Sequence, residues 1–237
     1  MPKTNSKKSK TNSTHSKGSN MPTRKAKKRL QLFIFIFLAA FCVALIIIFW
    51  LKKPHLATPN AYIALTQSYL ELKNTPNTHT QSSAQEDARA LIQRANATGY
   101  QLIDSHALAQ DLDSFVIIAT LPRGIYNLGL IPSAKHFAFA KSPSLKEIGK
   151  GTQQEWNQDS PDRSQQEFLE FLGADKNAKI LFYDEGDDIF APVGSAHTAI
   201  LWAQNFGYTN LYRLVGGFGA WKALGNPIST QKPHCCE

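Results

Sequence analysis

The chain has 237 residues but no cysteine between Cys42 and Cys235. A disulfide framework is therefore excluded for everything between these two positions. This part is long enough to form one domain with its own apolar core, which needs no crosslink. Cys235 and Cys236 are adjacent, and neighbouring cysteines form a disulfide only as a strained small ring.

Acidic residues are absent from the first 53 positions, which contain 12 of the 26 lysines and arginines. The remaining positions hold 14 basic and 18 acidic residues, so their net charge is −4. The overall excess of +8 thus belongs to the N-terminal segment and not to the folded part. We expect no basic surface for nucleic acid on the folded part, and we predict no nucleic-acid partner.

Apolar side chains are almost absent from residues 1–29, which are rich in serine, threonine, asparagine and lysine. A segment of this composition buries too little surface to offset its loss of chain entropy. We therefore predict a disordered, basic tail over residues 1–29.

Charge, proline and glycine are all missing from the apolar run Leu32–Leu51. A helix of this length spans about 30 Å, the thickness of the hydrocarbon core of a bilayer. Trp50 suits the membrane interface, and two lysines follow the run. The alternative is a cleavable signal peptide, but its apolar region has only about 7–15 residues and precedes small residues. We predict a transmembrane helix over residues 30–52, with the membrane as a partner.

The cations around this run predict its orientation. Residues 1–29 carry 10 lysines and arginines, whereas only Lys52 and Lys53 follow the run directly. Positive flanks stay on the cytoplasmic side. The chain is therefore predicted to be a single-pass protein of the inner membrane, with a cytoplasmic N-terminus and a periplasmic domain.

Two helices are expected in residues 53–99. Apolar residues recur at helical spacing over Ala61–Lys73. Ser83 followed by Glu86 is a capping-box pattern for a second helix, which ends before Gly99. A stalk or linker, a dimer contact and packing against the main domain all remain open for this segment.

Short strands and helices alternate from Tyr100 onward. The apolar runs Phe115–Thr120, Lys179–Asp184 and Asn210–Val215 indicate buried strands, and Ser195 is expected to open a helix between the last two. This alternation is typical of an α/β fold with a parallel sheet and helices on both faces.

The segment Gly207–Ile228, GYTNLYRLVGGFGAWKALGNPI, resembles the end of the rhodanese-like domain, as does the order of elements before it. The spacing from Ala119 through Tyr126 to Gly129–Ala134 is also similar to that family. The resemblance implies a rhodanese-like parallel sheet flanked by helices.

We accordingly expect the rhodanese-like domain to cover residues 100–229 and to be followed by a C-terminal tail at 230–237. Catalysis in that family uses a cysteine at the end of the fourth strand, in a cradle of backbone N–H groups. The matching position here is Asp184, and a carboxylate cannot hold a persulfide sulfur. The resemblance thus implies a domain without a catalytic residue or a cofactor, which acts as a binding or scaffolding module for a protein partner.

Three further departures replace polar groups by apolar ones. Ala119, Leu121 and Leu130 stand where the family usually has Asp, Arg and His. These replacements are compatible with a domain that is kept for its shape or for binding.

The loop Asp184–Gly194 is longer than is usual in the family and has no lysine or arginine, so it is expected to repel an anionic sulfur donor. Three interpretations remain open: a solvated surface loop, a Ca²⁺ or Mg²⁺ site, and a partner-recognition loop with Ile189 and Phe190 as apolar anchors. The spacing of the acids matches no calcium-loop pattern, and we predict no metal. Our candidate binding residues are Asp184, Glu185, Gly186, Asp187, Asp188 and Ser195.

The enzymatic alternative is a thiosulfate or persulfide sulfurtransferase that carries sulfur on Cys235 or Cys236 beside His234. His197 has no Cys or His at ligand spacing, so we expect a surface or packing residue there. The pair Gly216–Gly217 indicates a tight strand-to-helix turn rather than a phosphate loop.

Overall fold

A computed structural model describes residues 59–75, 82–145, 150–186 and 194–231. The predicted tail and transmembrane helix, the middle of the acidic loop and residues 232–237 lie outside these ranges. Within them, no helix combines the length and the apolar character that crossing a bilayer requires.

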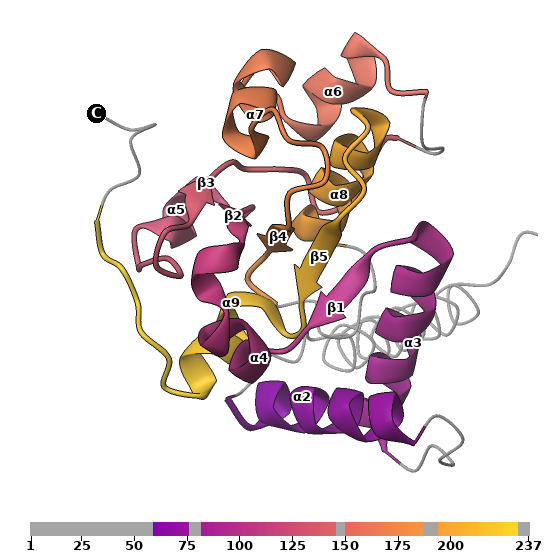
Figure 1. Cartoon of the computed structure of the whole chain (residues 1–237), viewed down its shortest axis with the longest axis vertical. Coiled ribbons are helices and arrows are strands. Elements are labelled where there is room, and N and C mark those ends of the chain that lie inside the picture. The colour runs from indigo at the N-terminus through magenta and orange to yellow at the C-terminus, as the bar shows by residue number, and fades with distance from the viewer. Residues whose placement is uncertain (1–58, 76–81, 146–149, 187–193, 232–237) are drawn as a thin grey trace, which may run out of the picture. The chain divides into compact units, whose positions relative to one another are not determined.

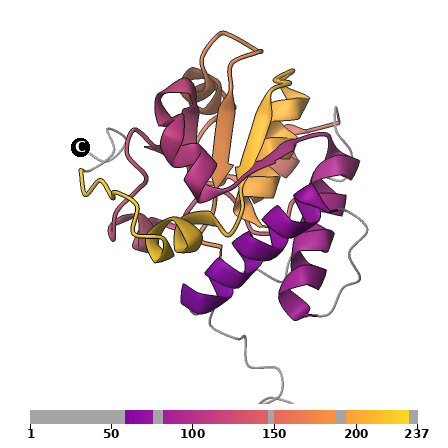
Figure 2. The ribbon, with the colours of Figure 1, turned by 60° about the horizontal axis from the view of Figure 1, so that its bottom comes forward.

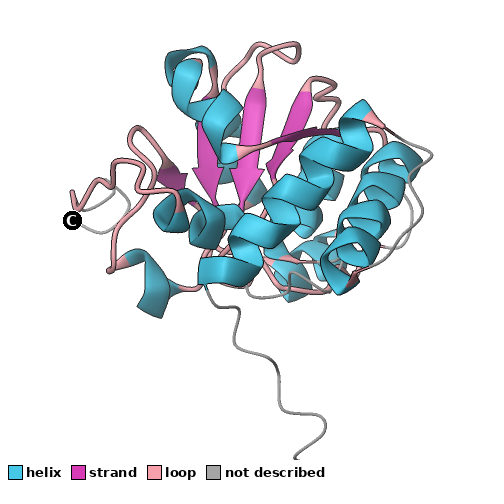
Figure 3. Ribbon diagram, turned by 90° about the horizontal axis from the view of Figure 1, so that it is seen from below, coloured by secondary structure: helices cyan, strands magenta, loops and turns pink. Residues whose placement is uncertain are grey.

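Five parallel strands form one sheet in the order β1-β5-β4-β2-β3. Helices cover both faces of this sheet (Figures 1 and 3), so the predicted parallel α/β arrangement is confirmed. The strands are β1 (Gln101–Ile103), β2 (Val116–Ala119), β3 (Lys135–His136), β4 (Ile180–Tyr183) and β5 (Leu211–Leu214). The described helices are α2 (Pro59–Asn74), α3 (Ser83–Thr98), α4 (Ser105–Gln110), α5 (Arg123–Tyr126), α6 (Gln153–Asp159), α7 (Gln165–Leu172), α8 (Ser195–Asn205) and α9 (Gly217–Ala223), with a 3₁₀ turn at Leu112–Ser114.

The central strand β4 is buried along its whole length, because helices cover both of its faces. One face packs against α7 and α8 through an aromatic cluster that includes Phe168, Phe182 and Trp202. The other face packs against α4 and α9 through Leu108 and Trp221. Burial of this much aromatic surface makes the two-sided core the main source of stability.

Helix ends follow local signals in the sequence. Ser164 and Glu167 form the predicted capping box of α7, and Gly99 ends α3 in a left-handed conformation. The cap of α3 is Ser82 rather than the predicted Ser83, and its hydroxyl accepts a hydrogen bond from the amide of Gln85. The prediction was off by one residue because two serines are adjacent, and only Ser82 has the extended backbone that a cap requires.

The helices α2 and α3 pack against the sheet domain, which is one of the alternatives left open for residues 53–99. Leu65 and Leu72 of α2 and Leu91 of α3 share a buried cluster with Val215 and Ala220. Figure 2 shows α2 lying across the domain with its N-terminal end at the edge of the sheet toward which the strands point. The end of α2 nearest the predicted anchor is therefore the end nearest the strand ends.

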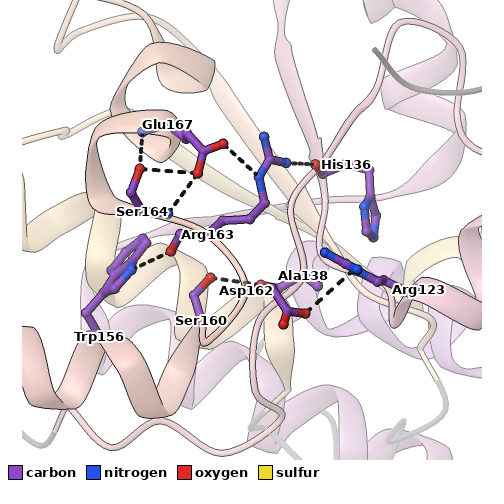
Figure 4. Close-up of polar contacts among 9 residues, drawn as sticks. All are labelled: Arg123, His136, Ala138, Trp156, Ser160, Asp162, Arg163, Ser164 and Glu167. Atoms are coloured by element: carbon purple, nitrogen blue, oxygen red, sulfur yellow. Dashed lines mark hydrogen bonds and ion pairs between the residues drawn. The ribbon is translucent and has the colours of Figure 1, made fainter. Parts of the chain in front are cut away.

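Arg163, just before α7, connects the start of that helix to strand β3 through polar contacts (Figure 4). Its guanidinium donates to the carbonyl of His136 at 2.9 Å and lies 4.5 Å from the ring centres of both Phe137 and Phe171. Its Nε lies 3.7 Å from a carboxylate oxygen of Glu167. The hydrogen bond and the two cation–ring contacts hold the edge strand β3 in place.

Candidate functional site

The loops after β4 and β5 are joined by main-chain hydrogen bonds at the carboxyl end of the sheet. The amide of Phe218 donates to the carbonyl of Asp184 at 2.8 Å, and the amide of Gly219 donates to the carbonyl of Glu185 at 3.0 Å. Ligands of open parallel sheets bind at this edge. The main-chain hydrogen bonds bring the loops after β4 and β5 together at this edge, where the candidate binding residues Asp184 and Glu185 lie.

Glycine is required where these two loops meet. Gly217 has a φ of +54°, and a Cβ atom there would lie 2.4 Å from the carbonyl oxygen of Asp184. A Cβ on Gly219 would lie 2.1 Å from the ring of Tyr62 on α2. The tight turn predicted at Gly216–Gly217 is confirmed, and α2 packs directly on it.

Asp184 forms an ion pair with Arg213 of β5. The guanidinium Nη2 lies 3.0 Å from Oδ2 of Asp184, and the two side chains are 6% and 14% exposed, with Arg213 the more buried. Sheet register explains the pairing, because Phe182 lies opposite Arg213 and Asp184, two residues further, points to the same face. Burial lowers the pKa of Arg213, but Asp184 and Tyr100 together outweigh the effect of burial, so that the net shift is upward.

The second carboxylate oxygen of Asp184 also has a hydrogen-bond partner. Its Oδ1 accepts a hydrogen bond from the amide of Gly186 at 3.2 Å. A Cβ atom on Gly194 would lie 2.5 Å from Oδ2, so the chain after the loop passes directly over the ion pair. The expected repulsion of anions at this strand end therefore does not apply to Asp184, because Arg213 matches its charge.

The hydroxyl of Ser195 is committed to a buried hydrogen-bond chain. Thr120 donates its hydroxyl proton to the carbonyl of Tyr183 at 3.0 Å. The 2.8 Å contact between the two hydroxyls then requires Ser195 to donate to Thr120. Ser195 is only 4% exposed and has no histidine base in this chain of contacts, so it is not arranged as a nucleophile.

A pocket of about 20 Å³ opens at this edge. Four of the candidate binding residues line it, together with three residues that were not predicted. Among the described residues, its lining consists of Asp184, Glu185, Gly186, Ser195, Pro122, Lys141 and Gly194. Asp187, Asp188 and the apolar pair Ile189 and Phe190 lie outside the described residues.

Most of the residues considered for metal or sulfur chemistry lie outside the described ranges. No group of three or more His, Cys, Asp or Glu side chains among the described residues is arranged to hold a metal ion. Asp184, the first acid of the loop, is already engaged with Arg213. Cys235, Cys236 and His234 lie beyond residue 231, the last that the structure describes.

The family model described as a rhodanese-like domain matches residues 84–224, more than half of the chain. The chain belongs to the rhodanese-like domain family. The match begins inside α3, upstream of Tyr100. No curated protein matches the chain.

Several solved structures are similar to the rhodanese-like domain of this chain. A rhodanese-related protein from Thermoplasma volcanium is 13% identical, with 56% of this chain and 100% of that one covered and a TM-score of 0.38. A protein from Anabaena sp. is 22% identical, with 54% and 82% covered and a TM-score of 0.37. A 3-mercaptopyruvate sulfotransferase from Escherichia coli is 21% identical, with 56% and 53% covered and a TM-score of 0.39.

Arg213 is the residue of this rhodanese-like domain that sequence reasoning missed. It interrupts the otherwise apolar run Leu211–Val215, and that single charge inside a buried strand was the available signal. A buried charge requires a partner of opposite charge. The carboxylate of Asp184, at the end of the neighbouring strand, was the candidate partner.

His197 lies on the first turn of α8, close enough to Arg213 and Asp184 for their charges to affect it. It is 3% exposed, its ring contacts that of Tyr100 at 5.8 Å, and its Nδ1 has no hydrogen-bond partner among the described residues. The packing role is thus confirmed and the surface position is wrong. Burial, Arg213 and Arg94 lower the pKa of His197 to about 4, so the ring is neutral at pH 7.

The free energy of unfolding of the rhodanese-like domain is expected to fall as the pH drops from about 6.5 to 4. Within this window the unfolded chain binds a proton at His197 and the folded domain does not. This difference lowers the free energy of unfolding by up to about 3 kcal/mol. The variant His197→Gln should flatten this part of the profile. Urea unfolding of both proteins at several pH values measures it, and parallel profiles would show that His197 is not the titrating group.

Proposed function

We propose that the rhodanese-like domain of this chain binds a protein partner at its strand-end pocket and does not transfer sulfur there. One observation supports this most directly: the side chain that follows β4 is a carboxylate, paired at 3.0 Å with Arg213. Sulfur transfer by a persulfide requires a thiolate that attacks the donor and then carries the sulfur. Asp184 has no sulfur atom, and its carboxylate is paired with Arg213.

The pocket's size and charges favour a protein partner over a small anion. At about 20 Å³ it is far below the several hundred Å³ of an ordinary small-molecule site. Its lining combines Lys141 with Glu185 and the prolyl ring of Pro122, which suits a mixed protein surface.

The purified full chain in detergent is expected to form no thiocyanate from thiosulfate and cyanide above the buffer background. The matched variant Cys235→Ser/Cys236→Ser should give the same result, since the terminal thiols are not part of the proposed site. Turnover by the native chain would refute the proposal. Its loss in the double variant would establish the alternative, a sulfurtransferase that carries sulfur on the tail.

Partner binding is tested by photo-crosslinking in the cell of origin. A photoreactive residue in place of Glu185, on the pocket, is expected to give a discrete adduct, whereas one in place of Gln166, exposed on α7, should not. The same adducts at both positions would contradict a partner site at the pocket.

We further propose that residues 32–51 anchor the domain in the inner membrane, with the N-terminus in the cytoplasm and the domain in the periplasm. The uncharged run of 20 residues and the cations before it support this topology. Resistance to alkaline extraction, combined with labelling of residue 166 by an impermeant reagent in a Gln166→Cys variant, tests both parts. Release by alkali would refute the anchor.

A further inference from the structure

The exposed large apolar side chains of the described residues gather in two neighbouring segments. Leu128 is 70% exposed, Leu224 43% and Ile228 40%. The segments touch, because Leu130 and Ser229 exchange two main-chain hydrogen bonds of 2.8 Å in an antiparallel bridge. We call residues 127–130 and 222–229 the apolar rim. Exposed apolar side chains on two joined segments are a candidate contact site.

Negative charge is absent from the apolar rim and from the sequence around it. No aspartate or glutamate occurs in residues 114–146 or in residues 189–236. Lys222 is exposed at the rim, with its ammonium 4.7 Å from the ring centre of Phe218. Apolar side chains beside a cation, in segments without acidic residues, complement a bilayer surface that contains anionic lipid.

The apolar rim follows α9, the helix on which the start of α2 packs. Tyr62, three residues after the start of α2, packs on Gly219 in α9, and α9 leads directly into the rim. The predicted transmembrane helix ends at residue 52, so that residues 53–58 connect it to α2. Six residues span at most about 22 Å. In the topology proposed above, this connection keeps the start of α2 within about that distance of the transmembrane helix.

We propose that the apolar rim docks on the lipid bilayer in which the chain is anchored. The inference rests on the anchor proposed above. Three side chains alone bind a membrane weakly, but a short tether turns docking into an intramolecular step with a high effective concentration. Docking would orient the domain and place its strand-end pocket, which lies at the same edge as the start of α2, near the membrane surface.

The test uses the full chain in liposomes of phosphatidylcholine and phosphatidylglycerol, with the three native cysteines replaced by serine. An environment-sensitive fluorophore is attached at Leu128→Cys or at Ile228→Cys, and quenching by doxyl-labelled lipid is measured. The control is Gln166→Cys, which is exposed on α7 across the sheet from α9. Quenching at residues 128 and 228 is expected to exceed that at residue 166 by about twofold or more.

A second variant tests whether the apolar side chains cause the docking. Leu224→Glu should reduce quenching at residue 228 to the level of the control, because a carboxylate opposes both insertion and the anionic surface. Equal quenching at residues 128, 228 and 166 in chains that float with the liposomes would overturn the docking while the anchor stands. A blue shift without lipid quenching would indicate a second copy of the chain on the rim and would also overturn it. Chains that do not float would refute the anchor and, with it, the docking.

Discussion

Replacing Arg213 by methionine is expected to destabilise the domain by about 3–5 kcal/mol. The substitution leaves the carboxylate of Asp184 at 14% exposure without its cation, while methionine fills most of the space of the arginine stem. Removing one partner of a buried ion pair costs more than removing both, because an unpaired charge must be kept out of water. Urea unfolding of the full chain, followed by far-UV circular dichroism, measures the loss.

The double variant Asp184→Leu/Arg213→Met is the matched control. It removes the whole pair and should be more stable than Arg213→Met alone, because no charge is then left behind. If the double variant lost as much stability as the two single variants together, the two side chains would not be coupled. That result would contradict the interpretation of Asp184 as a structural partner of Arg213.

The substitution Gly217→Ala is expected to cost about 2–5 kcal/mol, from left-handed backbone strain together with a steric clash. The added methyl group would lie 2.4 Å from the carbonyl oxygen of Asp184 and 2.8 Å from the amide nitrogen of Gly186. Both contacts are with backbone atoms, so relief requires the two strand-end loops to move apart. The shift in the urea midpoint measures the cost.

Gly225→Ala separates the two contributions. Gly225 also has a positive φ, of +73°, but no atom lies within 4 Å of the position that a Cβ would take. Strain alone should cost about 1–2 kcal/mol. Equal losses for both variants would show that the contact between the loops after β4 and β5 does not constrain Gly217.

Local patterns in the sequence predicted most of the sheet and its helices. The apolar runs before Thr120 and Asp184 became β2 and β4 because strands covered on both faces need continuous apolar side chains. The Ser164–Glu167 capping box and Gly99 fixed helix ends, because they satisfy backbone groups within a few residues. The short helix α5 and the two-residue strand β3 were not predicted, since segments of this length carry too little periodicity to recognise.

The structure brings several candidate binding residues together and adds interactions that the sequence did not predict. Asp184, Glu185, Gly186 and Ser195 line one pocket, as expected for residues that flank the loop after β4. Lys141 joins them from a distant part of the chain, and no local pattern marks it. The hydroxyl chain from Ser195 to Thr120 was also missed, because it joins residues 75 positions apart.

The sequence by itself determined the alternation of strands and helices, the carboxylate after β4, the glycines after β5 and the membership of the rhodanese-like family, because each is a pattern of neighbouring residues. Only the tertiary structure decided that Asp184 is neutralised by Arg213, that His197 is buried beside them and that α2 packs on the strand-end turn. These contacts depend on sheet register and on packing between elements far apart in the chain. A charge that appears exposed and repulsive in sequence can therefore be buried and paired in the fold.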